Sequence, residues 1–279
     1  MKVTLWGTRG SLASPGAETA RYGGNTSCVE VRGDAGTILV IDAGSGIRRL
    51  GRTVPRDLRR LDILLSHLHM DHIQGLGFFD PLHWSDIDVH IWGPASSTLG
   101  LRERLHRYLS PPLFPVRLRD LGCRLNLHEV PEDEVTIGEF QVRAAFICHP
   151  GPTVGYRIDD GRATVAYLSD HEPALAWGRA PLSPDWTSGY SIASGVDLLI
   201  HDAQYTADEY AERIGWGHST VDDAVTFALH AGARRLVPYH HDPSHDDEQL
   251  DRMTEAARRM ASTRCEVLPG REGDTLEVS

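Results

Sequence analysis

Three histidines and an aspartate fall within six residues in the first third of the chain. They are His67, His69, Asp71 and His72, and they directly follow the apolar run 61–65. In an extended chain alternate side chains point the same way, so His67 and His69 can converge on one point. Asp71 and His72 come where the chain is expected to turn, and they can face a second point nearby. Imidazole nitrogens and a carboxylate suit zinc or a similar first-row ion, so this stretch predicts part of a two-metal site.

Further polar residues stand repeatedly where an apolar strand is expected to end. Any one of them could be a capping or hydrogen-bonded residue without a ligand role. Several strand ends on one rim of a sheet, however, would form a shared floor for a site. The residues concerned are His149 after Gln141–Ile147, Asp170 after Ala163–Leu168, His201 and Asp202 after Val196–Ile200, and His240 after Arg235–Tyr239.

The sequence predicts that the elements that position these residues occur twice in the same order, first strands and then strand–helix units. Two hairpins are indicated by turn residues between apolar runs. Three longer stretches have helical patterning, and the last but one has Ser219 or Thr220 as a suitable N-cap. We therefore predict an α/β fold in one domain over residues 1–279, a four-layer αββα sandwich with two mixed β-sheets face to face and helices outside. The hairpins are 27–41 and 154–168, and the helices are 97–109, 221–231 and 246–262, with a further helix expected over 73–79.

The overall composition restricts the kinds of partner. The chain has 279 residues, a formal net charge of −11 at pH 7 and a pI of about 5.7. This acidic balance argues against a large nucleic-acid footprint, which needs a basic surface. We find no apolar run long enough to span a bilayer and no cleavable signal, and we expect a cytoplasmic protein without a membrane partner. The four scattered cysteines are expected to be reduced: Cys28, Cys123, Cys148 and Cys265.

Several weaker signals each allow a structural interpretation. The loop Gly7–Ser11 could cradle a phosphate, although a plain turn is the better interpretation of one glycine loop. The arginines between Arg48 and Arg60 could form a nucleic-acid patch, but a solvated helix face is favoured. Cys148 could be a metal ligand beside His149, but packing is favoured. The remaining histidines are interpreted as surface or structural residues: His83, His90, His106, His128, His230 and His245.

A Pro/Trp-rich insert, about Glu172–Gly189, follows Asp170 and has a length usually reserved for lids or binding loops. Its residues Trp177 and Trp186 could touch a substrate. For any single tryptophan, including Trp216, core or loop packing is the favoured interpretation over base stacking.

The chain closely resembles the metallo-β-lactamase-fold hydrolases, because Ser-His-Leu-His-Met-Asp-His at 66–72 matches their HxHxDH signature. Within that superfamily it is most similar to the phosphodiesterase branch that includes tRNase Z and related cyclic-nucleotide phosphodiesterases. The resemblance extends over about residues 2–250. The supporting stretches are Leu-Trp-Gly-Thr-Arg-Gly-Ser at 5–11, Gly-Gly-Asn-Thr-Ser at 23–27, Ile-Asp-Ala-Gly-Ser-Gly at 41–46, Tyr-Leu-Ser-Asp at 167–170, Gly-His-Ser-Thr at 217–220 and Tyr-His-His-Asp-Pro at 239–243.

The resemblance implies a complete set of ligands for two metal ions, expected to be Zn²⁺, with Mn²⁺ or Fe²⁺ also suited to such ligands. It implies that one ion is held by His67, His69 and His149. The second ion would be held by the remaining three ligands, and a seventh residue would supply a carboxylate to both ions. These are Asp71, His72 and His240 for the second ion, and Asp170 for the bridge.

Further residues are expected to support the reaction. His218 matches the histidine that contacts the scissile phosphate in this branch, and Asp71 could also take a proton from water. Asp202 stands where tRNase Z has a glutamate, and together with Asp42 it could orient the imidazoles. His241 is expected to hydrogen-bond a ligand or to face the substrate.

The leading hypothesis is a two-metal phosphodiesterase that acts on a small nucleotide diester, with a cyclic nucleotide as the favoured substrate. The alternatives are a tRNase Z-like ribonuclease, a hydrolase of a thioester or lactone, and a binding or sensor domain without activity. The last would be expected to have lost metal ligands, and none is missing here. Relatives in this family are often dimers, so a homodimer is expected.

Overall fold

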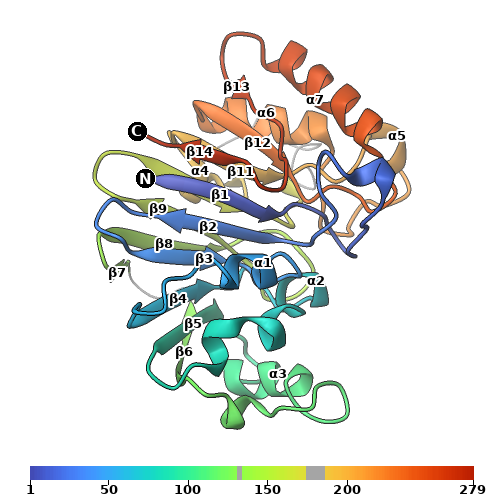
Figure 1. The fold of residues 1–279 in the computed structure, drawn as a ribbon. Coiled ribbons are helices and arrows are strands. Elements are labelled where there is room, and N and C mark those ends of the chain that lie inside the picture. Colours follow the sequence, from blue (N-terminus) through green and yellow to red (C-terminus); the bar gives the residue numbers. More distant parts are fainter. Residues whose placement is uncertain (131–133, 174–185) are drawn as a thin grey trace.

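The first of two β-sheets contains the N-terminal half of the chain. The computed structural model describes residues 1–130, 134–173 and 186–279, and in it the sheets lie face to face (Figure 1). In the first sheet the strands from β3 to β6 are parallel, whereas the others pair antiparallel. The spatial order is β14 (Thr275–Glu277), β1 (Lys2–Gly7), β2 (Cys28–Arg32), β3 (Ile38–Ile41), β4 (Arg60–Leu64), β5 (Asp88–Pro94) and β6 (Arg124–Val130).

The second sheet also has seven strands and repeats the same plan. Its strands from β10 to β13 are parallel and the rest are antiparallel. The order is β13 (Glu266–Val267), β12 (Arg235–Tyr239), β11 (Leu198–Asp202), β10 (Thr164–Leu168), β9 (Val154–Asp159), β8 (Phe140–Phe146) and β7 (Val135–Ile137). The predicted arrangement of two mixed sheets with helices outside is confirmed.

Three apolar cores separate the layers. One lies between the sheets and joins residues such as Leu5 and Ile41 to Tyr156 and Ile200. A second packs the outer face of the first sheet against α1 (Ile47–Gly51), α2 (Met70–Ile73) and α3 (Leu101–Tyr108). The third packs the second sheet against α4 (Tyr190–Ala193), α6 (Val221–Ala231) and α7 (Asp247–Ala261). The remaining short helices are α5 (Ala207–Tyr210) and the 3₁₀ turns Ala17–Thr19, Leu76–Phe78, Asp80–His83 and Leu118–Asp120.

Helix α6 occupies the predicted residues and begins at the predicted cap. The Thr220 side chain accepts a hydrogen bond from the Asp223 amide, and the Asp223 side chain accepts one from the Thr220 amide. Both otherwise unpaired backbone donors of the first turn are thus satisfied. Gly232 ends the helix in the left-handed conformation, at φ 68°. The start of α6 is therefore fixed directly after His218.

The helix predicted over 73–79, with His72 in its first turn, is wrong in its extent, although His72 is helical as predicted. Helix α2 begins at Met70, so it contains Asp71 and His72, and the chain leaves it after Ile73. The Gly75 amide donates to the Ala43 carbonyl. A Cβ on Gly75 would lie 2.1 Å from the Gly44 carbonyl oxygen, so this glycine allows the turn to pack against the loop after β3. This packing ends α2 and leaves only a 3₁₀ turn beyond it.

Strands β6 and β7 were not predicted, although polar residues alternate with apolar ones in both, as is typical of a strand with one buried face. Among the described residues, no helix is both long and apolar enough to cross a membrane. Cys28, Cys123 and Cys265 are buried free thiols, in agreement with the prediction. The arginines of 48–60 lie at the surface, where Arg59 pairs with Asp86.

Candidate metal centre

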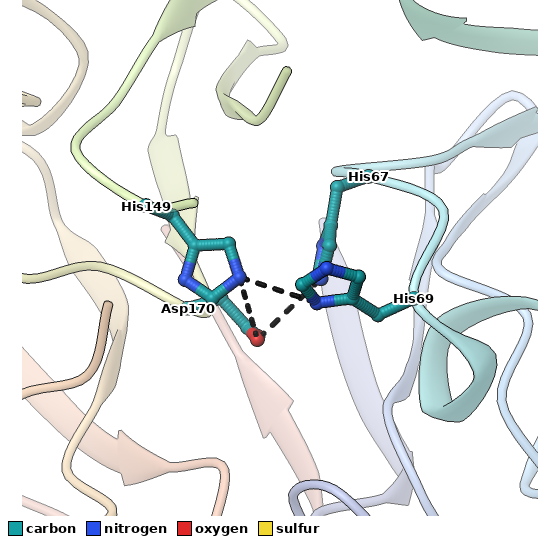
Figure 2. Close-up of side chains that lie close together, drawn as sticks. All are labelled: His67, His69, His149 and Asp170. Carbon is teal, nitrogen blue, oxygen red and sulfur yellow. Dashed lines mark hydrogen bonds and ion pairs between the residues drawn. The ribbon is translucent and has the colours of Figure 1, made fainter. Parts of the chain in front are cut away.

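Two clusters of side chains meet at the rim where strands of both sheets end. In the first cluster, His67, His69, His149 and Asp170 bring one potential ligand atom each to within 4.8 Å of one another (Figure 2). The Asp170 Oδ2 lies 3.5 Å from His67 Nε2 and 3.7 Å from His149 Nε2. The His149 Nε2 is 3.3 Å from His69 Nδ1. Three imidazole nitrogens and one carboxylate oxygen therefore converge from separate segments.

The second cluster uses the other oxygen of the same carboxylate. The Asp170 Oδ1 is 3.0 Å from His72 Nε2 and 3.1 Å from His240 Nε2. The Asp71 Oδ2 lies 3.2 Å and 3.1 Å from these two nitrogens. All four residues are buried and their ligand atoms lie within 4.8 Å of one another. Asp170 thus joins the two clusters, as the resemblance implied.

The strand ends that carry these residues are adjacent in the sheets. Strands β10, β11 and β12 are parallel neighbours, so their carboxyl ends deliver Asp170, Asp202 and His240 to one rim. Strand β4 ends at Leu64 and leads into the segment with His67 and His69. Extended backbone at His69 then turns into α2.

Backbone strain is concentrated at this rim. Asp42, Asp170, His240 and Ser11 all have positive φ between 53° and 60°, a region that costs an L-residue about 1 kcal/mol or more. Each of these residues directly contacts the second cluster or belongs to it. The surrounding structure therefore holds these residues in place against a local preference for other conformations.

The donor set fits metal ions. His67 Nε2 is buried and has no hydrogen-bond partner among the described residues, although a lone pair or N–H there needs one. The outer nitrogens of three other imidazoles bond to protein oxygens, which leaves the inner nitrogens as lone-pair donors. These bonds are His72 Nδ1 to Asp42 at 2.7 Å, His240 Nδ1 to Gln204 Oε1 at 2.9 Å and His149 Nδ1 to the Gly217 carbonyl at 2.9 Å.

The electrostatics of the two carboxylates and of His67 favour the protonation states that metal ligands need. The pKa of His72 is instead raised well above its ordinary value, because the surrounding carboxylates, Asp170 foremost, outweigh its burial. Burial opposes the ionisation of Asp170, but the nearby imidazoles of His240 and His72 outweigh it and hold the pKa of the carboxyl well below its usual range. Asp71 behaves in the same way, with His72 as the main opposing neighbour, and its pKa is lowered. Burial, reinforced by His72, lowers the pKa of His67 well below its ordinary value. Ionised carboxylates and a neutral His67 are the forms that bind a cation.

Asp42 contacts the second cluster through a hydrogen bond to His72. Its fully buried carboxylate accepts hydrogen bonds from the Ser66 amide, the Ser66 hydroxyl and the Tyr167 hydroxyl, at 2.7–2.8 Å, in addition to His72. The carboxylate thereby ties β3, the segment after β4 and β10 together. This is the orienting contact that was considered for Asp42.

His218 stands beside both clusters and is held by Asp202. Its Nδ1 lies 2.7 Å from Asp202 Oδ2, and its ring stacks on His240 with centroids 5.0 Å apart. Asp202 Oδ1 accepts from the Ser219 amide and the Gln204 amide. Burial lowers the pKa of His218, but the Asp202 carboxylate outweighs it and raises the pKa to about 9. A protonated imidazole next to the clusters can stabilise an anion or donate a proton.

The structure contradicts one interpretation, that His241 faces a substrate. Its side chain is buried, with 3% of the residue exposed, its Nε2 bonds the Gly270 carbonyl at 2.9 Å and its ring packs edge-on against Tyr22. It follows His240, whose φ of 60° redirects the chain directly after β12, and its side chain turns away from the rim.

The sequence reasoning missed the residues that support the ligands from loops. Gln204 orients His240, and the Ser11 amide donates to Asp71 Oδ2 at 2.8 Å. Glu172 accepts hydrogen bonds from the Gly215 and Gly217 amides. Gln204 follows Asp202 by two residues and could have been found as a polar residue near a strand end. Nothing in the local sequence indicated Ser11 or Glu172.

The loop Gly7–Ser11 is a plain turn, as favoured. The amides of Thr8 and Arg9 donate to the Asn25 carbonyl, and the Gly10 amide donates to the His241 carbonyl. A Cβ on Gly10 would lie 2.4 Å from His240 Nδ1, so the loop packs directly against a ligand. Its backbone donors are already used within the protein, which leaves no cradle for a phosphate.

The other histidines and Cys148 stay outside the clusters. None of the candidate ligand groups found among the described residues contains them. His90 and His128 stack on each other, and His245 pairs with Glu209. The predicted insert lies partly outside the described residues, and Trp177 is among those not described, whereas Trp186 is exposed.

Comparison with known proteins gives a consistent result. The family model described as "Beta-lactamase superfamily domain" matches residues 37–241. The chain is 29% identical over 289 residues to ribonuclease Z of Brevibacillus brevis, covering 90% of this chain and 88% of that protein, and 29% identical to ribonuclease Z of Methanopyrus kandleri, covering 81% and 83%. Among solved structures it is similar to the metallo-β-lactamase fold protein YhfI from Bacillus subtilis, with a TM-score of 0.70, 22% identity and coverage of 99% and 98%. Human tRNase Z, short form, gives a TM-score of 0.69 and 22% identity over the whole of both chains.

Proposed function

Because this chain belongs to the β-lactamase superfamily, we propose that it is a hydrolase that cleaves phosphodiester bonds at a two-metal centre. The observation that carries the proposal is the arrangement around Asp170, whose two oxygens face two separate sets of three ligands. A second support is the histidine beside them, His218, which is positioned by its own carboxylate. This combination is complete, which argues against a binding domain without activity.

The proposed centre holds two Zn²⁺ ions, or Mn²⁺ or Fe²⁺, one in each cluster. When bound, such a pair supplies Lewis acidity and a nucleophile at neutral pH. Asp170 fixes the distance between the two sites. The Asp71 carboxylate is placed to receive a proton from the attacking water, and protonated His218 is placed to neutralise the phosphate or to protonate the leaving oxygen. Asp202 keeps His218 in the correct orientation and charge state.

RNA is the better supported substrate. Both ribonuclease Z relatives align with more than four fifths of this chain and of their own length. This support favours RNA over a cyclic nucleotide as the first substrate to test.

A small nucleotide diester remains the second candidate, because of the charge of the chain. The net charge of −11 works against binding a large polyanion. A site confined to the metal clusters and one adjoining loop would suffice for a small diester.

The test is hydrolysis by purified protein loaded with Zn²⁺ or Mn²⁺. We expect metal-dependent turnover of bis-p-nitrophenyl phosphate. The rate of cleavage of a precursor tRNA transcript is then compared with the rates for a panel of cyclic nucleotides. Asp71→Ala is the matched inactive control. Absence of metal-dependent turnover on every diester, or wild-type activity of Asp71→Ala, would refute the proposal.

A further inference from the structure

Trp216 differs from the tryptophans that the fold uses for packing. Trp6 donates its Nε1 to Glu30, and Trp92 donates its Nε1 to Asp62. Arg56 covers the ring of Trp84. Trp216, by contrast, is 59% exposed, and among the described residues its side chain has no hydrogen bond, ring contact or cation partner. An exposed indole without a packing role is a candidate for ligand contact.

The loop 211–217 that carries Trp216 is adjacent to the metal centre. Its last residue, Gly217, accepts a hydrogen bond from His149 Nδ1, and His218 comes next in the chain. Gly217 has a φ of 92°, and a Cβ there would lie 2.1 Å from His149 Nδ1. The backbone at Gly217 therefore lies directly against the ring of His149, and Trp216 is the residue before it in the chain.

The same loop is held rigidly although its tip is exposed. The Glu172 carboxylate, 1% exposed, accepts from the Tyr210 hydroxyl at 2.6 Å, the Gly215 amide at 2.7 Å and the Gly217 amide at 2.6 Å. Three hydrogen bonds to one buried carboxylate fix both sides of the Trp216 position. A surface fixed in advance costs little conformational entropy when a ligand binds.

The loop 211–217 also carries a positive charge, on Arg213. The Arg213 guanidinium lies 5.0 Å from the centroid of the Tyr205 ring, and that ring contacts His218 edge-on. Arg213 pairs with no carboxylate among the described residues and bonds only the Glu209 carbonyl. An exposed aromatic ring and an unpaired cation on one loop beside the proposed metal centre match the chemistry of a nucleotide, which has a flat base and an anionic backbone.

We propose that Trp216 stacks on a nucleobase of the substrate, on a loop that Glu172 holds in place against the metal centre. This inference rests on the proposed phosphodiesterase function and specifies its substrate class as a diester that carries a nucleoside. Stacking on an exposed ring tolerates every base, so it favours nucleosides over simple alkyl groups without choosing one base.

The experiment compares two esters with the same leaving group, thymidine 5′-p-nitrophenyl phosphate and methyl p-nitrophenyl phosphate, on the metal-loaded enzyme. We expect Trp216→Ala to raise KM for the thymidine ester about tenfold and to change KM for the methyl ester less than about twofold. Trp216→Phe keeps a flat ring and should retain most of the difference. Met260→Ala, an exposed apolar change on α7, is the control and should alter neither.

The outcomes separate this inference from the proposed function. Turnover of both esters with an equal effect of Trp216→Ala on each, or with no effect, would overturn base stacking and leave the phosphodiesterase intact. Failure of the wild-type enzyme to hydrolyse either ester would overturn the function and the stacking together. Metal content measured for each variant shows whether a loss of activity instead reflects loss of His149 as a ligand.

Discussion

The two clusters that share Asp170 differ in how closely the protein surrounds them. Asp71, His72 and His240 are buried, and each is held by a partner within the protein. In the other cluster His69 is exposed, and its outer nitrogen has no hydrogen bond among the described residues. We call the first the closed cluster and the second the open cluster. If the proposed function holds, we expect the closed cluster to retain metal more tightly and the substrate to enter on the side of the open one.

The largest expected effect on metal content and turnover follows from replacing Asp170, the residue that both clusters share. Asp170→Ala removes a ligand oxygen from each, so we expect metal content to fall at both sites and turnover to fall by at least about a thousandfold. Asp71→Ala should empty only the closed cluster. Elemental analysis and kinetics of the two variants together check this. Equal metal content in both variants would contradict the assignment of Asp170 as the bridge.

His218→Ala tests a residue that stands beside both clusters without being needed by either. We expect turnover to fall about a hundredfold because an acid next to the phosphate is lost. Metal content should stay at the wild-type level. A parallel fall of activity and metal content would instead indicate that His218 is a metal ligand. The geometry allows this, because His218 forms a third group of close ligand atoms with Asp170, Asp202 and His240.

Asp42→Asn should distinguish the clusters by affinity. The amide nitrogen conflicts with the donors that face Asp42, so His72 loses its orientation and the closed cluster should bind metal about ten- to a hundredfold more weakly. The open cluster should keep its affinity. Metal titration with two resolved affinities is the measurement. Asp62→Asn is the matched control, because Asp62 is also a buried aspartate but bonds Arg60 and Trp92. A similar loss of affinity in both variants would show a general effect of destabilisation.

The smallest effect is expected for Glu172→Gln. The amide group would face the Gly217 amide with a second donor, which loosens the carbonyl that orients His149. We expect the affinity of the open cluster to fall by less than about tenfold and the closed cluster to be unchanged. Chelator-release kinetics of the variant and the wild type provide the measurement. A faster release from the closed cluster, without a change in the open cluster, would contradict the comparison.

The polar residues at the strand ends could be singled out from the sequence for a physical reason, whereas the ligand set was implied by the resemblance to the metallo-β-lactamase-fold hydrolases. A residue such as Asp170 or His240 follows a buried apolar strand, and strand ends occupy one rim whatever the details of the loops. Helix α6 was predicted at its correct bounds because Thr220 and Gly232 mark its ends locally.

The residues that orient the ligands could not be predicted in the same way. Ser11 reaches Asp71 across 60 positions, and Glu172 reaches Gly217 across 45, through loops whose shape depends on tertiary packing. The early end of helix α2 could not be predicted for the same reason, since Gly75 bonds to Ala43 on another loop. His241 could not be placed either, because it is next to His240 in the sequence, whereas the positive φ of His240 and the bond to the Gly270 carbonyl turn its side chain into the protein.

The bridge between the clusters also has a consequence for folding. Asp71 and His72 come from the half of the chain that forms the first sheet, whereas His149, Asp170 and His240 come from the half that forms the second. A metal ion therefore finds its full coordination only after the two sheets have docked through the core between them. Binding to the native state alone shifts the equilibrium toward it in proportion to the logarithm of the ion concentration. Ions bound at the proposed centre would thus act as a cross-link between two halves of the molecule, and their release would loosen the docking of the sheets as well as end the proposed catalysis.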